Sequence, residues 1–244
     1  GLSGATTMIS PTSFITLILG FLLSFTYTQL KSMQEENLAV DIRKNILRAL
    51  DIREEKNEEW SNEKVQDLFN KYIKAEVVSK NGLILNNINI ENIDAEYDSI
   101  NFPIYYKLND NQIDGYAIPV IGRGLWSTLY GYLALEPDAS TVKGIQFYSH
   151  KETPGLGAEI EKDWFTNNFI GKKIVNSNGE LVSIEVLRGK VDELSNDAYH
   201  QVDGISGATM TTKGVTQFLL EDLQKYEPFF KKIRTEVKEI TWLY

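Results

Sequence analysis

Asp203-Gly204-Ile205-Ser206-Gly207-Ala208-Thr209-Met210-Thr211-Thr212 is the stretch of this 244-residue chain that most constrains its fold. Two glycines and several small side chains let the backbone turn tightly and bring its N–H groups close to a ligand. Apolar residues then recur at helical spacing, at Val215, Phe218, Leu219 and Leu223. The pattern predicts a small-residue loop that leads into an amphipathic helix over residues 211–226.

Thr209 therefore places a hydroxyl where a loop enters a helix. Free backbone N–H groups and the positive end of the helix dipole make such a place suitable for an anion, and a phosphate is a typical one. An ordinary Ser/Thr helix cap fits the same residues. This stretch alone leaves both interpretations open.

The first thirty residues predict a membrane anchor. They carry no charge, and the segment 14–25 is strongly apolar. A bilayer core needs about 20 residues of helix, which 9–30 supply, and Thr and Ser within a helix can bond back to its carbonyl groups. The segment has no basic region before the apolar run and no obvious cleavage site, so a retained anchor is favoured over a cleaved signal peptide.

Composition excludes several classes of function. The net charge of −9 argues against a general nucleic-acid binder, which needs a basic face. The absence of cysteine rules out disulfides, thiolate metal sites and cysteine nucleophiles. With only His150 and His200, we expect no histidine-rich metal site.

The remaining pattern predicts an α+β fold, with antiparallel sheets, packed helices and one preceding transmembrane helix. Helices are expected at 38–50 and 60–72. Paired strands are expected at 77–79 with 83–85 around the hairpin signal Asn81-Gly82, at 104–108 with 115–120, and at 129–135 with 142–148. A short helix at 163–169 and a strand at 182–187 follow. We divide the chain into an anchor (1–30), a helical leader (31–75) and a domain (76–244) on which the leader packs.

A second loop, Glu152-Thr153-Pro154-Gly155-Leu156-Gly157, follows a predicted strand. Glu152 offers an acceptor, Thr153 a donor and Leu156 an apolar contact, a combination that suits a flat ring with polar edges. Pro-Gly alone also predicts a plain surface turn.

Taken together, the two loops closely resemble the FMN-binding domain family. The resemblance implies FMN as a covalent phosphoester on Thr209, attached by a separate flavin transferase. It also implies that the ring lies against the second loop, and that Asp203 either contacts the flavin or braces the turn. Thr211 and Thr212 are expected to cap the helix. The cofactor-binding residues implied are Thr209 with Asp203, Gly204, Ser206, Gly207, Ala208 and Thr211 in the first loop, and Glu152, Thr153, Leu156 and Gly157 in the second.

Two related membrane complexes contain such a subunit. The segment 122–132 and Asn45-Ile46-Leu47 resemble the C subunit of the sodium-pumping NADH:quinone oxidoreductase, and the G subunit of the Rnf ferredoxin:NAD complex is the alternative. Either resemblance implies an electron relay between membrane subunits. The sodium-pumping complex implies a body on the periplasmic side of a bacterial inner membrane. The chain has no Gly-x-Gly-x-x-Gly fingerprint, so NADH is expected to bind elsewhere, and no residue is assigned as catalytic.

Two other classes of function remain open at this point. In a non-redox, membrane-anchored binding domain, Thr209 would only cap the helix. In a hydrolase, Ser206 or Thr209 would be the nucleophile, but no base is placed beside them. Leu125, Trp126 and Tyr130 would lie near the flavin, form a partner surface or pack in the core, and core packing is the general fate of large apolar side chains.

Overall fold

The computed structural model describes residues 11–55 and 58–241, with two compact units that divide between Asp41 and Ile42. The helix α1 (Pro11–Ala49) runs unbroken from the predicted anchor into the predicted leader. Residues 1–10 of the predicted anchor lie outside the described part. The division of the chain at residues 30 and 75 stays a prediction.

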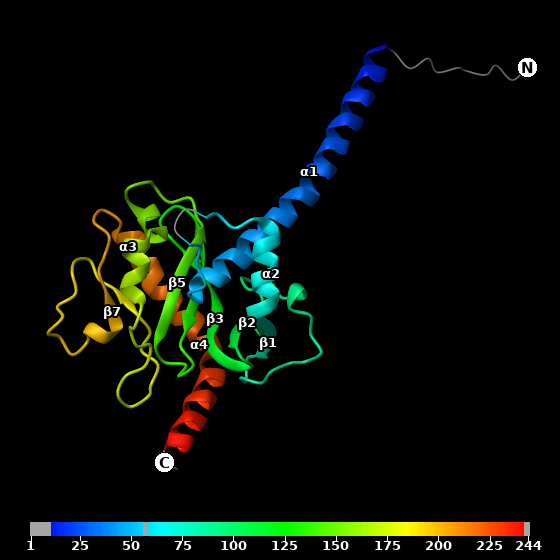
Figure 1. Ribbon diagram of the computed structural model, residues 1–244. Helices are drawn as coiled ribbons and strands as arrows, with labels where there is room; N and C mark the ends of the chain where they lie inside the picture. The colour runs from blue at the N-terminus through cyan, green and yellow to red at the C-terminus, as the bar shows by residue number, and fades with distance from the viewer. Residues whose placement is uncertain (1–10, 56–57, 242–244) are drawn as a thin grey trace, which may run out of the picture. The chain divides into compact units, whose positions relative to one another are not determined.

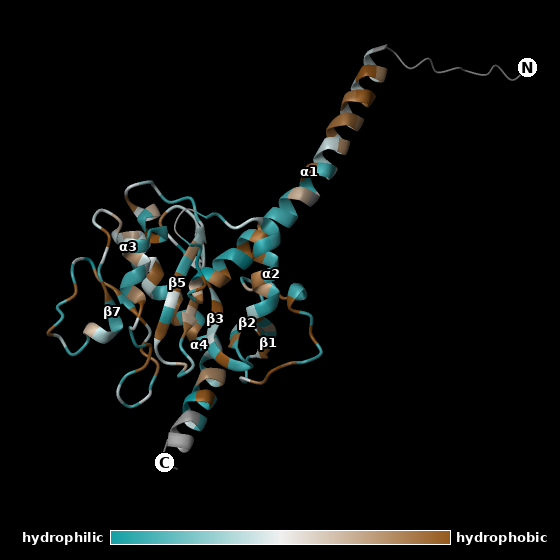
Figure 2. Cartoon of the chain, in the orientation of Figure 1, coloured by the Kyte–Doolittle hydropathy of each residue, from teal (hydrophilic) through white to brown (hydrophobic). Residues whose placement is uncertain are grey.

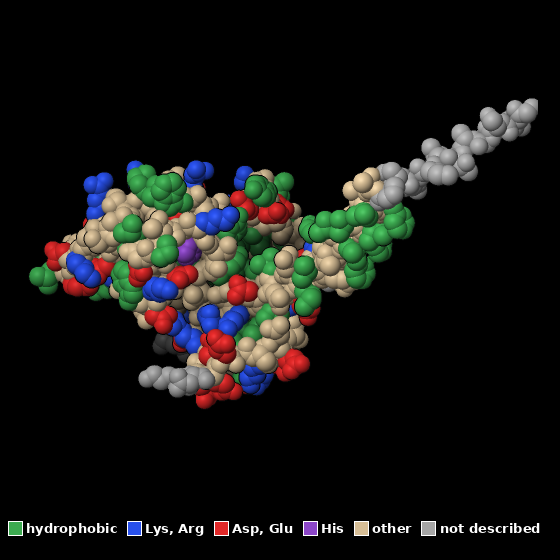
Figure 3. Space-filling model, turned by 90° about the horizontal axis from the view of Figure 1, so that it is seen from above, with side chains coloured by type: hydrophobic (Ala, Val, Ile, Leu, Met, Phe, Trp, Pro, Cys, Tyr) green, Lys and Arg blue, Asp and Glu red, His purple; other side chains and the backbone are tan. Residues whose placement is uncertain are grey.

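The apolar part of α1 fits the predicted membrane helix. It is the one helix of the described chain that is long and apolar enough to cross a bilayer. Figure 2 colours this part of the helix as hydrophobic, and Figure 3 shows hydrophobic side chains on its surface. Thr26 Oγ1 donates to the Leu22 carbonyl at 2.8 Å, and Thr28 Oγ1 donates to the Ser24 carbonyl at 2.8 Å. These hydroxyls thus bond within the helix, as expected.

The second unit is built on a five-stranded antiparallel sheet with the order β1-β2-β3-β4-β5 (Figure 1). Its strands are β1 (Ile73–Ser79), β2 (Asn101–Asn109), β3 (Gln112–Arg123), β4 (Thr128–Leu135) and β5 (Val142–Ser149). Asp110 and Asn111 form the two-residue turn between β2 and β3, with φ of 48° and 64°. The predicted α+β class with an antiparallel sheet is confirmed.

Two predicted strands are reduced in the structure. The segment 83–85 returns antiparallel along the free edge of β1 but pairs only through the bridge Val78–Ile84 and the flanking bonds Ser79 N–H to Leu83 and Leu85 N–H to Val77, so it is shorter than a full strand. The predicted strand at 182–187 shrinks to β6 (Glu185–Val186), which pairs in parallel with β7 (Gln201–Val202). For β6 the partner is more than ten residues away in the sequence, so the local pattern does not show how far the strand extends.

Helices cover both faces of the sheet. The other α-helices are α2 (Asn62–Tyr72), α3 (Asp163–Thr166) and α4 (Thr209–Thr241), and the 3₁₀ turns are η1 (Ile90–Asn92), η2 (Gly157–Glu161), η3 (Asn167–Phe169) and η4 (Ala198–His200). On one face, α4 buries Phe218, Leu219 and Tyr226 in the main core. On the other, Leu50 at the end of α1 and Phe69 of α2 pack in a smaller cluster.

α4 extends beyond its predicted end at Tyr226 and passes through Pro228. A proline removes one backbone donor and normally kinks or ends a helix. Here Phe229 and Phe230 remain buried in the core, so the apolar face of the helix continues past the proline. Lys232 Nζ also donates to the carbonyl of Gly82 at 2.9 Å, which fastens this part of α4 to the β1 turn.

Two prolines open the sheet between β2 and β3. The ladder ends at the pair Tyr105–Ala117, and continued register would place Pro103 opposite Pro119, where neither residue can donate an N–H. α4 supplies partners at this opening. The Ile121 N–H donates to Asp222 Oδ2 at 2.7 Å, and the Tyr226 hydroxyl donates to the Pro103 carbonyl at 2.7 Å.

Asp222 is expected to matter as a hydrogen-bond acceptor more than as a charge. Burial raises its pKa, although Lys225 and the Ile121 N–H act in the opposite direction. Asp222→Ala leaves a buried N–H without a partner and should lower the free energy of unfolding by about 2 kcal/mol. Asp222→Asn keeps an acceptor oxygen and should cost less than half of that. Urea denaturation of both variants checks this order, and equal losses would contradict it.

Candidate functional site

Glu152 joins three segments that are distant in the sequence. Its carboxylate is buried, with the residue 5% exposed. Oε1 accepts the N–H groups of Trp126 at 2.8 Å and Ser127 at 3.3 Å, from the loop between β3 and β4. Oε2 accepts the hydroxyl of Thr211, in the first turn of α4, at 2.6 Å. The two predicted loops therefore meet at one side chain.

Two glycines give this carboxylate its space. A Cβ atom at Gly124 would lie 2.7 Å from Glu152 Oε1. A Cβ atom at Gly157 would lie 2.7 Å from both Glu152 Oε2 and Thr211 Oγ1. Such contacts are shorter than carbon and oxygen tolerate, so the last glycine of the second loop is needed for the Glu152–Thr211 hydrogen bond.

The environment of Glu152 favours its ionised form. Burial by itself raises the pKa of this carboxyl group. The hydrogen bonds from Thr211 and from the backbone N–H groups of Trp126, Ser127 and Leu125 outweigh that effect and hold the pKa below its ordinary 4.5. Near neutral pH, Glu152 is thus a buried anion that only accepts hydrogen bonds.

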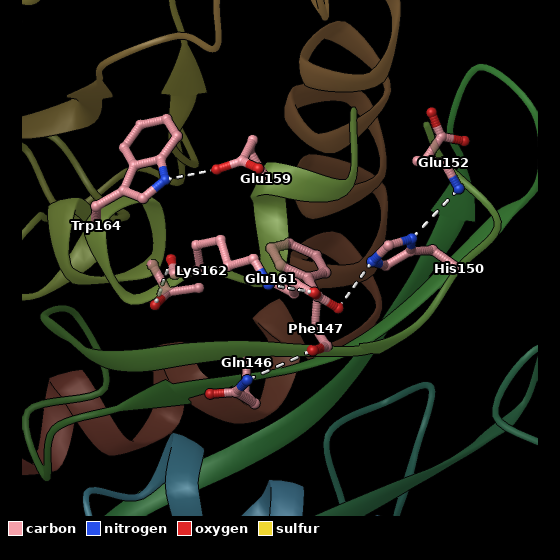
Figure 4. Close-up of polar contacts among 9 residues, drawn as sticks. Gln146, Phe147, His150, Glu152, Glu159, Glu161, Lys162 and Trp164 are labelled. Carbon is pink, nitrogen blue, oxygen red and sulfur yellow. Dashed lines mark hydrogen bonds and ion pairs between the residues drawn. The ribbon is translucent and has the colours of Figure 1, made fainter. Parts of the chain in front are cut away.

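His150 fixes the start of the same loop (Figure 4). Its Nδ1 accepts the Glu152 N–H at 3.3 Å, and its Nε2 lies 3.2 Å from Glu161 Oε2. Because Nδ1 is the acceptor, Nε2 carries the ring hydrogen and donates it to Glu161. Neighbouring Trp164 donates its indole N–H to Glu159 at 2.9 Å. The two bonds of His150 orient the backbone from which Glu152 points inward.

The three threonines at the start of α4 have different roles. Thr211 and Thr212 are buried. Thr212 Oγ1 donates to the carbonyls of Ala208 and Thr209, both at 3.2 Å. The expectation that Thr211 and Thr212 cap the helix is wrong, because both hydroxyls act as donors here and neither accepts a helix N–H.

Thr209 is the first residue of α4 and is half-buried. Its hydroxyl makes no hydrogen bond to any residue that the structure describes. The first bond along the helix runs from the Thr212 N–H to the Ala208 carbonyl at 3.0 Å. The N–H groups of residues 209–211 therefore have no carbonyl partner within the helix and face its N-terminal end.

Direct contact joins the second loop to the first. Gly207 has φ of 76°, and a Cβ atom there would lie 2.8 Å from Leu156 Cδ2. Leu156, Thr153, Ser206 and Gly207 are exposed, whereas Ala208 and Gly157 are buried. The structure thus brings the predicted residues of both loops to one corner of the domain.

Asp203 braces a turn. It accepts the Val191 N–H at 2.8 Å and pairs with Lys190. Beside it, the Gly204 N–H donates to the Gly189 carbonyl at 2.8 Å. Of the two roles considered for Asp203, the structure shows the brace. A contact between Asp203 and a flavin stays a prediction.

Gly204 and Gly189 make a matched pair of substitutions. A Cβ atom at Gly204 would lie 1.9 Å from the Leu187 carbonyl oxygen, but one at Gly189 would meet nothing within 4 Å. Gly204→Ala should lower the free energy of unfolding by about 3 kcal/mol, since the backbone must move. Gly189→Ala should change it by less than about 0.5 kcal/mol. Thermal unfolding of the two variants compares them, and similar melting temperatures would contradict the prediction.

The sequence did not reveal how Leu125 and Trp126 contribute. The expectation that Leu125 and Trp126 pack in the core is wrong, because both side chains are exposed. Glu152 instead accepts a hydrogen bond from the backbone N–H of Trp126. Tyr130 is half-buried, and its hydroxyl donates to Glu96 at 2.8 Å. Only Gly122 and Gly124, which precede Leu125 and Trp126, could have indicated a functional turn.

Comparison with known proteins gives consistent matches. The family model described as FMN-binding domain matches residues 124–224. The C subunit of the Na(+)-translocating NADH-quinone reductase from Pseudomonas aeruginosa is 46% identical over 116 residues, 48% of this chain and 44% of that protein. The Haemophilus ducreyi protein of the same name is 33% identical over 225 residues and is covered to 82%, as is this chain.

A solved structure extends the likeness to three dimensions. The crystal structure of the C subunit of the Na(+)-translocating NADH-quinone reductase from Parabacteroides distasonis superposes with a TM-score of 0.71 at 35% identity. The match covers 82% of this chain and 96% of that one. The chain spans about half the length of the Pseudomonas relative, and most of the Haemophilus and Parabacteroides proteins.

Proposed function

The chain belongs to the family formed by the C subunits of the Na(+)-translocating NADH-quinone reductases, and from this premise we propose that it is an electron relay that carries FMN as a phosphoester on Thr209. The assignment to Thr209 rests on which threonine hydroxyls at the start of α4 already form hydrogen bonds within the protein. Thr211 and Thr212 use theirs inside the protein, whereas the hydroxyl of Thr209 is uncommitted within the described chain. Thr209 therefore has the hydroxyl that can be modified without breaking a buried contact.

The residues around Thr209 fit an FMN group. The N–H groups of the first turn of α4 suit its phosphodiester. Leu156, exposed beside Gly207, offers an apolar surface for the ring, and Thr153 offers a polar contact at the same loop. Bound FMN would supply the redox chemistry, and the protein would hold and tune it.

Attachment requires a second protein. A threonine hydroxyl is a weak nucleophile without a base, and no described side chain bonds to that of Thr209. We propose that a flavin transferase supplies the base. Thr209 Oγ then bonds to the flavin-side phosphorus of FAD, the bond to AMP breaks, and the hydroxyl proton passes to the transferase.

α1 would hold the subunit in a bacterial inner membrane as a single span, with the folded unit on the periplasmic side. Neighbouring membrane subunits of the reductase would deliver and accept electrons, and NADH would bind to one of them. This subunit would thus be one flavin station of the complex and would have no complete active site of its own.

Peptide mapping of the full chain tests the attachment site. The chain is produced together with a flavin transferase, denatured, washed and digested. We expect the peptide covering residues 204–213 to carry the mass of FMN minus one water, with fragment ions that locate it on Thr209. An unmodified peptide in protein made with an active transferase would favour the non-redox alternative, in which Thr209 only begins the helix.

A further inference from the structure

A cavity lined by four tyrosines lies on the face of the sheet that carries the smaller hydrophobic cluster. Its volume is about 240 Å³, and residues of β2–β5, of the loop 90–96 and of α1 line it. The aromatic residues in its walls are Tyr105, Tyr130, Tyr132 and Tyr148. Pockets for drug-sized ligands measure roughly 300–1,000 Å³, so this cavity suits a smaller ligand.

The four rings stand in several orientations. Tyr132 and Tyr148 are stacked, with ring centroids 5.7 Å apart and planes at 17°. The Tyr105 ring is turned by 83° from that of Tyr132, with centroids 5.8 Å apart. The Tyr130 ring is tilted by 45° from that of Tyr148, at 6.4 Å. Aromatic rings attract cations to their negative faces, and rings set at different angles form the cages that recognise quaternary ammonium groups.

The charged side chains that line the cavity are two carboxylates, Asp94 and Glu96. Asp94 accepts the Glu96 N–H at 3.0 Å, and Glu96 accepts the Tyr130 hydroxyl at 2.8 Å. Neither carboxylate pairs with a lysine or arginine of the described chain. Burial raises the pKa of Tyr105 to about 12 and lifts that of Tyr132 well above its ordinary 10, so these phenols stay neutral. The cavity therefore carries a negative charge that the described chain does not neutralise.

The remaining walls suit methyl groups better than N–H donors. Pro103 and Pro119 line the cavity, together with Ile42 and Ile93. A primary ammonium such as that of lysine brings three N–H donors that each need an acceptor. A quaternary ammonium has no donor to satisfy, and its methyl groups can contact proline and isoleucine directly.

A cation of the protein already lies against an aromatic ring on the same face. The Arg43 guanidinium is 5.8 Å from the centroid of the Phe69 ring. Phe69 in turn packs edge-on against Tyr105, with centroids 6.3 Å apart. Arg43 does not line the cavity, so it leaves the four tyrosines available to a ligand.

We propose that the cavity binds a small quaternary ammonium cation between the tyrosine rings and the carboxylates of Asp94 and Glu96. The rings stabilise its charge, the apolar walls contact its methyl groups and the carboxylates balance it. Free cations such as choline carry this group, and so do the headgroups of choline lipids. Thr209 and the flavin take no part, so the proposal is independent of the attachment chemistry.

Isothermal titration calorimetry of the purified full chain in a maltoside detergent tests the site. Choline replaces sodium at constant ionic strength. The neutral alcohol 3,3-dimethylbutanol has the shape of choline without its charge and is the matched probe. We expect saturable binding of choline, and about tenfold weaker binding of the alcohol. Equal binding of the two probes, or no saturable binding of choline, would overturn the proposal.

Two further probes identify the source of the ammonium group. Glycerophosphocholine that binds more tightly than choline would assign the cavity to a lipid headgroup, and weaker binding would assign it to a free cation. Both results support a quaternary ammonium site. Butylammonium, which imitates a lysine side chain, should bind more weakly than choline. Tighter binding of butylammonium would indicate a lysine of another protein and would show the proposal to be wrong.

Matched variants locate the binding in this cavity. Glu96→Gln removes a charge but keeps an acceptor for the Tyr130 hydroxyl, and should weaken choline binding about threefold. Glu91→Gln removes a charge from the same loop outside the cavity, and should bind choline as wild type does. Tyr148→Leu should weaken binding about tenfold, whereas Tyr199→Leu, at a ring that is 67% exposed elsewhere, should not. Equal effects within the Glu96 and Glu91 pair would contradict the proposal, even if Tyr148→Leu failed to fold.

Discussion

Thr209→Val is expected to abolish covalent flavin and leave the fold intact. Valine has nearly the shape of threonine but no hydroxyl, so it cannot form the phosphoester. The Thr209 side chain makes no hydrogen bond within the described chain, and its loss should therefore change the free energy of unfolding by less than about 1 kcal/mol. The measurement is intact mass and in-gel flavin fluorescence of denatured protein made with a transferase.

Two controls separate this effect from general damage to the motif. Ser206→Ala removes an exposed hydroxyl three residues before Thr209 and should keep full flavin content. Thr212→Val removes a buried hydroxyl that donates to the Ala208 and Thr209 carbonyls, and should lower stability more than it lowers flavin content. A Thr209→Val protein that still carries the adduct would refute the assignment of Thr209.

The fold was predictable to the extent that local patterns determine it. The pairs β2–β3 and β4–β5 have strong alternating or apolar runs and short connections, and the structure contains both. The end of α4 was not predictable, because Pro228 usually marks the end of a helix and only the burial of Phe229 and Phe230 explains its continuation. The opposition of Pro103 and Pro119 depends on register, which is a property of two strands and not of either one.

In the candidate site, too, some features were predictable from local sequence and others depend on tertiary contacts. Two short motifs suffice to predict which loops meet, and Thr209 stands out as the residue at the helix entrance. The roles of their neighbours could not be read from the motifs. Glu152 has both carboxylate oxygens engaged inside the protein, and Thr211 is its donor, although the sequence suggested a ligand contact and a cap. A side chain's direction depends on contacts formed only on folding, which here join residues 26 and 59 positions apart.

Glu152→Ala is expected to be the most damaging single substitution at the site. It leaves the Thr211 hydroxyl and the N–H groups of Trp126 and Ser127 without their acceptor. Each unsatisfied buried donor costs about 1–3 kcal/mol, so the free energy of unfolding should fall by about 3–5 kcal/mol in total. The first turn of α4, which carries Thr209, would lose its fixed position, and flavin content should fall as well.

Conservative variants separate the charge from the hydrogen bonds. Glu152→Gln keeps one acceptor oxygen for the N–H groups of Trp126 and Ser127, and should lower the free energy of unfolding by about 1–2 kcal/mol. Thr211→Val should cost a similar amount, and Thr211→Ser should restore most of it. Glu152→Gln and Thr211→Val both remove the Glu152–Thr211 hydrogen bond. The loss of unfolding free energy in the double variant should therefore be smaller than the sum of the losses in the two single variants. Strict additivity would show that the Glu152–Thr211 bond contributes little.

The pH dependence gives an independent measure of the buried anion. The pKa of Glu152 is lower in the folded protein than its ordinary 4.5, so the ionised form stabilises the fold. That contribution is fully present above 4.5 and is lost as the pH falls through the folded-state value. Wild type should therefore exceed Glu152→Gln in stability near neutral pH and approach it in acid, as urea denaturation at a series of pH values would show. A difference that is constant or grows in acid would mean that Glu152 is not held as an anion, because only an ionised acceptor loses its advantage on protonation.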